Sequence, residues 1–394
     1  MRYVDLDNIK PGMRLARPIY NKAGVLLYER GSAIKDLSVI QNIKGFGLIG
    51  LFILEPTEPV PPMTEEDIEF ERFQTMMTFQ IQEELNYIIE KKKDQKLDTI
   101  AEAIIRAYGR RRRKVNFIQG LRSKDDYYYK HALNVAILSA LIAHAMNVPA
   151  HDQMEAVKAS LVHDIGKIRM PAELYAKPEL SKEDKDAITQ YELQGHMLIG
   201  EAFMTEPNLK RIATQTQRIL KTGDFGADLK KIKVFPATRI MTVAERFDLQ
   251  TAMQPGREPY SEISVLQEMR RAPEVYDSKA INGLINSITL LMPGASVVLS
   301  NGMKALVLQT GEDILRPMVL TFDTNRIIDL AHQPADDPIY VVDTVKTLDN
   351  RVVMDSSTLK QFGFTAKAQD AEVVQDTAYV PSENDLTEET EVKQ

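Results

Sequence analysis

One short segment carries the side chains best suited to chemistry. Residues 161–167 read Leu-Val-His-Asp-Ile-Gly-Lys, so His163 and Asp164 stand together at the end of an apolar stretch. A polar pair in such surroundings is costly unless a partner or a metal ion satisfies it. Imidazole with carboxylate is a common ligand set for Zn, Mn or Fe. On a continuing helix, Lys167 would share the face of this pair and could neutralise a phosphate.

Two other segments offer ligands of the same kind. His131 opens an apolar stretch that ends at Met146, and Glu245 again lies among apolar residues. A set of two imidazoles and two carboxylates would serve one divalent cation, and its members are His131, His163, Asp164 and Glu245. Such a cation polarises a phosphoryl oxygen and lowers the pKa of a bound water toward about 7. The competing interpretation is that the histidines satisfy core or capping contacts, and spacing alone leaves both open.

The elements that must position these residues are helices. Residues 123–290 are mostly helical by pattern, and His131–Met146 is apolar almost all round, as expected of a central buried helix. Met154–Ile168 predicts a second helix, stopped by Pro171. Further helices are predicted to begin near Ser181, Pro236 and Ser278. The fold class expected is therefore mainly α.

Small β-rich units are predicted on both sides of this core. Residues 1–55 alternate as a β-rich N-terminal domain, and residues 291–345 show period-two strands around an Asn301-Gly302 turn. Four prolines mark residues 56–63 as a linker. Residues 64–122 then predict a helical connector, in which Thr64 is the first N-cap.

Composition narrows the class of protein. The chain has 394 residues, 44% of them hydrophobic and 27% charged, which is typical of a soluble globular protein. It contains no cysteine, which excludes disulfide scaffolds, iron–sulfur sites and thiol nucleophiles. No secretory h-region and no apolar stretch long enough for a bilayer are visible, so we expect a cytoplasmic protein with no membrane contact.

The charge lies mainly at one end. Of the net charge of −7, residues 365–394 carry −6 through eight acids and two lysines, and they predict an acidic disordered tail. The remainder is near neutral, so nucleic-acid binding is not expected despite the basic run Arg110–Lys114. Such a run is typical of a solvated helix end, and no interleaved aromatic residues support a stacking surface.

In their order along the chain, these motifs resemble the HD-GYP branch of the HD phosphohydrolase superfamily. The residues that carry the resemblance are His131, Ala159–Ile168, Pro171, Lys177-Pro178, Leu180-Ser181, Gly195, Arg239-Ile240, Val243–Asp248, Pro259-Tyr260, Val297–Gly302 and Arg316-Pro317. The segment around Pro11-Gly12-Met13 is similar to the small domain that often precedes such modules. The resemblance implies hydrolysis of cyclic di-GMP in bacterial signalling, with two or three Fe or Mn ions held by Glu, His and Asp.

Several positions of the family pattern are filled differently here. The family's Glu before the first His falls at Tyr127, and its next His falls at Tyr191. The paired His and the Gly-Tyr-Pro signature should lie near Gln215–Gly226, which contains neither. The last metal-binding Asp becomes Glu245, one methylene longer. What survives is the simpler set of His131, His163, Asp164 and Glu245, with Lys167 beside it.

The remaining candidates are few. His144, His151 and His196 are expected to be structural or surface residues, because helical spacing places His144 and His196 on other faces and His151 falls in a predicted loop. Arg257 precedes Glu258-Pro259-Tyr260 and is the candidate phosphate contact that the resemblance implies. A solvated loop arginine is the equally open alternative.

Three hypotheses follow. In the first, the protein is a degenerate HD-GYP relative that is weak or inactive and acts in signalling by binding a partner. In the second, it is a mononuclear phosphohydrolase of a nucleotide or phosphomonoester, in which Asp164 and Lys167 are catalytic and Lys167 and Arg257 contact substrate. In the third, it is a conventional cyclic di-GMP phosphodiesterase. The first hypothesis tolerates the absence of a metal ion, the second needs one ion, and the third needs two or more. The resemblance also implies a homodimer through the helix over residues 64–90.

Overall fold

The protein is described from a computed structural model of the chain. The described residues are 2–21, 24–54, 64–171, 174, 177, 179–223, 234–255, 257–291, 293–333 and 338–344. Residues Met1–Val353 form one compact unit, and all described residues belong to it. The predicted linker at 56–63 and the predicted tail at 365–394 lie outside the described residues.

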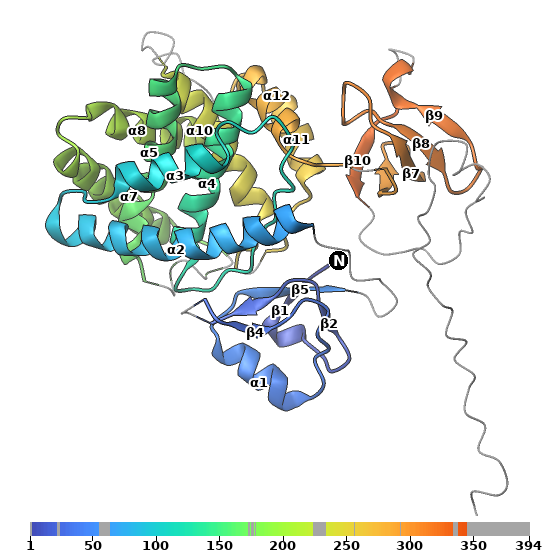
Figure 1. The fold of residues 1–394 in the computed structure, drawn as a ribbon, viewed down its shortest axis with the longest axis horizontal. Helices are drawn as coiled ribbons and strands as arrows, with labels where there is room; N and C mark the ends of the chain where they lie inside the picture. The colour runs from blue at the N-terminus through green and yellow to red at the C-terminus, as the bar shows by residue number, and fades with distance from the viewer. Residues whose placement is uncertain are drawn as a thin grey trace, which may run out of the picture. The chain divides into compact units, whose positions relative to one another are not determined.

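The centre of the helical body is α4, Tyr127–Ala145. Nearly all of its residues are buried, because α5 (Ala150–Val162), α10 (Pro236–Thr251) and α12 (Ser278–Ser287) pack around it (Figure 1). A helix that is apolar all round is stable only in such a position. The predicted central helix is therefore confirmed, although it begins one turn earlier, at Tyr127.

Two more helices, α2 (Glu65–Lys91) and α3 (Leu97–Ala107), pack against α4. The long helix α2 begins with a capping box in which Thr64 and Asp67 satisfy each other's backbone N–H groups. It contacts α4 and α3. The basic run Arg110–Lys114 follows α3 in a turn and an irregular segment. Thr64 as the N-cap is thus confirmed.

The second predicted helix ends earlier than expected. It was predicted over Met154–Ile168, but α5 stops at Val162 and a short 3-10 helix, η2, covers Ile165–Arg169. His163 is the last residue with helical backbone geometry, and Asp164 leaves that conformation. The break turns Asp164 away from the axis of α5 and toward the neighbouring helices.

Within the described residues, three further helices belong to the body: α7 (Lys182–Ala202), α8 (Pro207–Thr222) and α11 (Glu262–Arg270). Ser181 caps α7 in a second capping box, as predicted. The turn η2 lies directly against α7, where Gly166 meets Gly195: a Cβ built at Gly195 would lie 2.7 Å from the Gly166 nitrogen. Only residues without a side chain permit this approach.

The N-terminal unit is small and β-rich. Strands β1 (Arg2–Asp5) and β2 (Arg14–Leu15) pair antiparallel with β5 (Gly50–Leu54) between them. A two-stranded ribbon of β3 (Ile19–Tyr20) and β4 (Leu26–Tyr28) and the helix α1 (Leu37–Gly45) complete it. Strand β1 was not predicted, because Arg2–Asp5 is too short and polar to show a clear alternation.

A five-stranded antiparallel sheet follows the helices, in the order β10-β6-β7-β8-β9. Its strands are Val341–Thr344, Ser296–Leu299, Lys304–Gln309, Met318–Thr321 and Ile327–Asp329, in that order. Gly302 takes a φ of +81° in the turn between β6 and β7, as the Asn301-Gly302 pair predicts. The fold class is confirmed as mainly α with small antiparallel sheets at both ends. Within the described residues, no helix combines the length and apolarity needed to cross a bilayer.

Candidate metal centre

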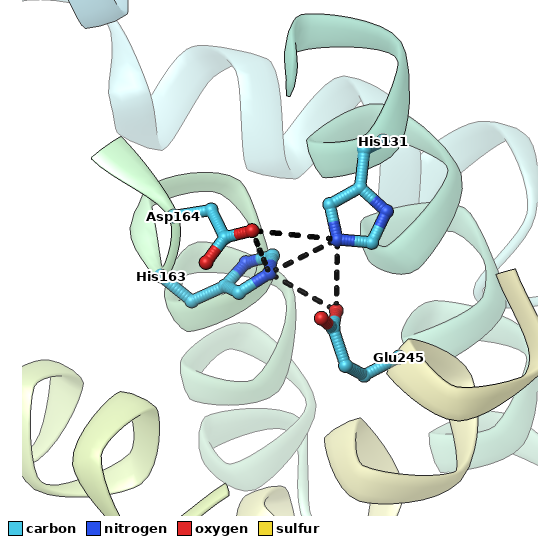
Figure 2. Close-up of side chains that lie close together, drawn as sticks. All are labelled: His131, His163, Asp164 and Glu245. Carbon is cyan, nitrogen blue, oxygen red and sulfur yellow. Dashed lines mark hydrogen bonds and ion pairs between the residues drawn. The ribbon is translucent and has the colours of Figure 1, made fainter. Parts of the chain in front are cut away.

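Four predicted ligands converge from three elements of the helical body (Figure 2). Oε2 of Glu245, on α10, lies 3.0 Å from Nε2 of His131, on α4, and 3.0 Å from Nε2 of His163, at the end of α5. The two Nε2 atoms are 3.3 Å apart. Oδ2 of Asp164 lies 3.8 and 3.7 Å from them. The structure thus brings together residues that are up to 114 positions apart in the chain.

The outer nitrogen of each imidazole has a defined partner. Nδ1 of His131 lies 2.7 Å from a carboxylate oxygen of Asp248, and Nδ1 of His163 lies 2.7 Å from the carbonyl oxygen of Ser160. Both oxygens can only accept, so each Nδ1 is the donor. In the neutral imidazoles, both Nε2 atoms therefore present lone pairs to the centre of the cluster.

The donor set fits a divalent cation. Two Nε2 lone pairs and two carboxylates are all acceptors, and Oε2 of Glu245 is buried without a well-formed hydrogen bond among the described residues. Buried acceptors that face one another need a proton or a cation between them. Ligand bonds of about 2.1 Å at right angles separate neighbouring donor atoms by about 3.0 Å. His131, His163, Asp164 and Glu245 are the residues that would hold the ion.

The electrostatics of the cluster agree with this assignment. Burial by itself lowers the pKa of His131, but Glu245 and Asp248 outweigh it and raise that pKa to about 10. The pKa of His163 is also raised, by Glu245 and Asp164 against the effect of burial. Burial would raise the pKa of Glu245, yet the two imidazoles hold it well below its usual range. Protons and a metal ion therefore compete for the same Nε2 atoms.

Asp248 was not predicted as a site residue, although it is central to the site. Its carboxylate is completely buried and accepts hydrogen bonds from Arg122, Asn134 and Gln119 as well as from His131. Asp248 lies three residues after Glu245, which on one helix places both on the same face. That spacing is the signal that could have identified it.

Lys167 lies beside the cluster, but on the turn η2 and not on a continuation of α5 as predicted. The helix does not continue to it, and it reaches Asp164 from the turn η2, with Nζ 2.9 Å from Oδ1 of Asp164. Its second contact is Glu192 on α7, at 3.3 Å, and Glu192 also contacts Lys221. Burial would lower the pKa of Lys167, but the carboxylates of Asp164 and Glu192 raise it, so the ammonium stays charged.

The structure does not bring Arg257 to the four ligands. Its guanidinium donates to the carbonyl oxygen of Leu249 at 2.9 Å and lies over the ring of Tyr260. Tyr127, at the position of the family's Glu, is buried and stacks on His131 with ring centroids 6.3 Å apart. It contributes an aromatic wall to the site.

The other histidines differ from expectation in two places. His151 does not lie in a loop: it is in the first turn of α5, exposed and 3.2 Å from Glu155. His196 is outside the four-ligand cluster but buried, and burial lowers its pKa while the charges of Glu192 and Asp164 oppose that shift. It therefore lies in the neighbourhood of the cluster rather than on a remote face.

A comparison with known protein families finds a match over the helical body. Residues 115–280 match the family model described as HD domain, which includes all four ligands and Asp248. The helical body is therefore similar to HD domains over these residues.

One characterised relative and one solved structure are similar to the chain. The cyclic di-GMP phosphodiesterase PA4108 of Pseudomonas aeruginosa is 24% identical over 210 residues, which are 52% of this chain. The match spans only 50% of that relative's length. The structure of Bd1817, an HDG"Y"P protein from Bdellovibrio bacteriovorus, covers 72% of this chain and 97% of its own at 11% identity. Its TM-score of 0.38 is too low to bear on the fold.

Proposed function

We propose that the chain is a single-metal HD phosphohydrolase that acts on a nucleotide phosphoester, with cyclic di-GMP as the first substrate to test. The convergence of His131, His163, Asp164 and Glu245 on one point is the observation that carries this proposal. The phosphodiesterase relative supports the substrate class. Fe or Mn is the proposed ion, since imidazole and carboxylate ligands suit both.

The residues around the centre have separate tasks in this proposal. A bound divalent cation would polarise a phosphoryl oxygen and acidify a water. Lys167 keeps a charged ammonium within 2.9 Å of Asp164, where it would neutralise a phosphate held at the centre. Lys167 also holds the pKa of the buried Asp164 below its ordinary value, so this ligand stays ionised. Arg257 stays a proposed substrate contact, although its guanidinium donates to Leu249 in this structure.

A second function is favoured by one specific observation. Tyr127 and Tyr191 replace two ligands of the family pattern, and Tyr127 is buried against His131. A second metal ion would therefore lack ligands, and a pocket that binds cyclic di-GMP without hydrolysing it is the alternative. In that case the protein would act in bacterial signalling through a protein partner.

Turnover separates the two functions. We would load the protein with Mn²⁺ and measure hydrolysis of cyclic di-GMP and of a mononucleotide, comparing wild type with Glu245→Gln. Glu268→Gln is the matched control, because Glu268 is an exposed carboxylate whose partner, Arg246, lies on α10. Hydrolysis that is lost in Glu245→Gln and kept in Glu268→Gln supports the enzyme. Tight binding of cyclic di-GMP without turnover supports the binding module.

Domain limits and assembly are also proposals. We infer domains at 1–55, 64–122, 123–290 and 291–345.

We also infer a homodimer contact along α2. Ile68 and Met76 support the contact, since both are exposed on that helix at 47% and 54%. Light scattering on the variant Ile68→Lys/Met76→Lys tests it, with a monomer expected if wild type is dimeric.

A further inference from the structure

Three side chains besides His131 donate hydrogen bonds to the carboxylate of Asp248. Nη2 of Arg122 lies 2.7 and 2.6 Å from its two oxygens, Nδ2 of Asn134 lies 2.8 Å from Oδ1, and Nε2 of Gln119 lies 3.1 Å from Oδ1. The side chains of Arg122 and Asp248 are 1% and 0% exposed. A buried ion pair costs desolvation and by itself is weak evidence for stability. Its position behind a metal ligand suggests another purpose.

That purpose follows from the tautomer of His131. If Asp248 accepts from Nδ1, the neutral imidazole keeps its proton there and offers Nε2 to a cation. In the other tautomer, a hydrogen on Nε2 would point into the cluster, where Glu245 and His163 lie at 3.0 and 3.3 Å. A carboxylate behind a ligating histidine fixes its orientation and raises its basicity.

Arg122 also joins the metal centre to the N-terminal unit. Its carbonyl oxygen accepts from the N–H of Ile49 at 3.0 Å, and the N–H of Lys124 donates to Gly47 at 3.2 Å. Leu48 and Ser123 form the antiparallel bridge between these bonds. Leu121, the residue before Arg122, packs in the hydrophobic core of the N-terminal unit. The backbone of Arg122 thus bonds to the N-terminal unit, while its guanidinium binds Asp248 in the helical body.

We propose that Arg122 and Asp248 are positioning residues of the metal centre, and that docking of the N-terminal unit on Arg122 contributes to metal affinity. The inference rests on the proposed single-metal site and adds the residues that set its strength. Arg122 acts through Asp248, and Asp248 acts through His131. Neither touches the ion or the substrate.

The first test is Mn²⁺ affinity in three variants of the full chain. Asp248→Asn and Arg122→Met should each weaken binding by about 10- to 100-fold. Because both act along one route, the double variant should be no weaker than Asp248→Asn alone, whereas independent structural damage would add. Arg239→Met is the matched control, since it removes an arginine–aspartate pair between α10 and the N-cap of α12 that includes neither a ligand nor Asp248.

A milder variant covers the case in which Arg122→Met does not fold. Asn134→Ala removes one hydrogen bond to Asp248, together with bonds to Gln119 and Gln74, and should weaken Mn²⁺ binding several-fold in a chain that still unfolds cooperatively in urea. Equal affinity in wild type, Asp248→Asn and Asn134→Ala would overturn the positioning role while leaving the metal site intact. If wild type itself binds no Mn²⁺, the proposed function fails, and this inference fails with it.

The link to the N-terminal unit has its own comparison. Leu48 and Ile40 are both 7% exposed and belong to the same core, but Leu48 lies in the bridge to Ser123, the residue after Arg122, whereas Ile40 lies in α1. Leu48→Ala should therefore lower Mn²⁺ affinity at least threefold more than Ile40→Ala, although both destabilise that unit. Equal affinities in the two variants would overturn the link.

Discussion

The side-chain length of Glu245 is the single-residue property that defines this site. Its carboxylate reaches both Nε2 atoms at 3.0 Å from a helix on the far side of the cluster. The family resemblance predicts the shorter Asp at this position. If the extra methylene is needed to close the distance, Glu245→Asp should weaken Mn²⁺ binding by about tenfold, because sites of this kind tolerate only about 0.5 Å of displacement. Titration calorimetry measures this, and unchanged or tighter binding would show that the helices adjust.

Titration of His131 gives a second prediction at this scale. Its pKa in the folded chain is raised from 6.5 to about 10, with burial opposed by Glu245 and Asp248. The stabilisation is therefore complete below pH 6.5 and is lost as the pH rises through about 10. EDTA-treated protein should show a urea midpoint that falls over this range. His131→Gln should show a flatter profile, and parallel profiles would contradict the assignment.

At the scale of elements, the contact between η2 and α7 positions Lys167. A Cβ at Gly166 would collide with the backbone carbonyl of Tyr191, and backbone cannot move aside as a flexible side chain can. Gly166→Ala should cost about 1–3 kcal/mol of unfolding free energy. Gly45→Ala is the control, since nothing lies within 4 Å of its Cβ position. A urea midpoint unchanged in both would mean that η2 is loosely packed.

The sequence pattern predicted which segments are helical better than it predicted where those helices end. Capping at Thr64 and Ser181 and the all-apolar run of α4 are local properties, so sequence pattern was sufficient to predict them. The end of α5 at Val162 depends on Asp164 turning toward Lys167 and on Gly166 meeting Gly195. The approach of Gly166 to Gly195 involves α7, and the pattern of residues within one segment cannot predict a contact with another helix. Asp248 was missed although its spacing from Glu245 was visible, because its partners Arg122, Asn134 and Gln119 come from other segments of the chain.

At the scale of the whole molecule, the bridge between the N-terminal unit and the helical body can be tested covalently. Leu48 and Ser123 face each other in a non-hydrogen-bonded antiparallel pair, the spacing that suits a disulfide. The chain has no cysteine, so Leu48→Cys/Ser123→Cys can form only the intended bond within one chain. We expect it to form in air and to raise the thermal midpoint relative to the reduced form. No crosslink on non-reducing mass analysis would contradict the pairing.

The number of metal ions per chain tests the central claim most directly. Elemental analysis of anaerobically purified protein would be made on wild type, His163→Ala and His151→Ala. His151 is the control, because it is an exposed histidine on α5, the helix that ends just before His163, and it lies outside the cluster. The account predicts one Fe or Mn ion per chain, lost in His163→Ala and retained in His151→Ala. No ion after loading, or two and more ions per chain, would contradict it.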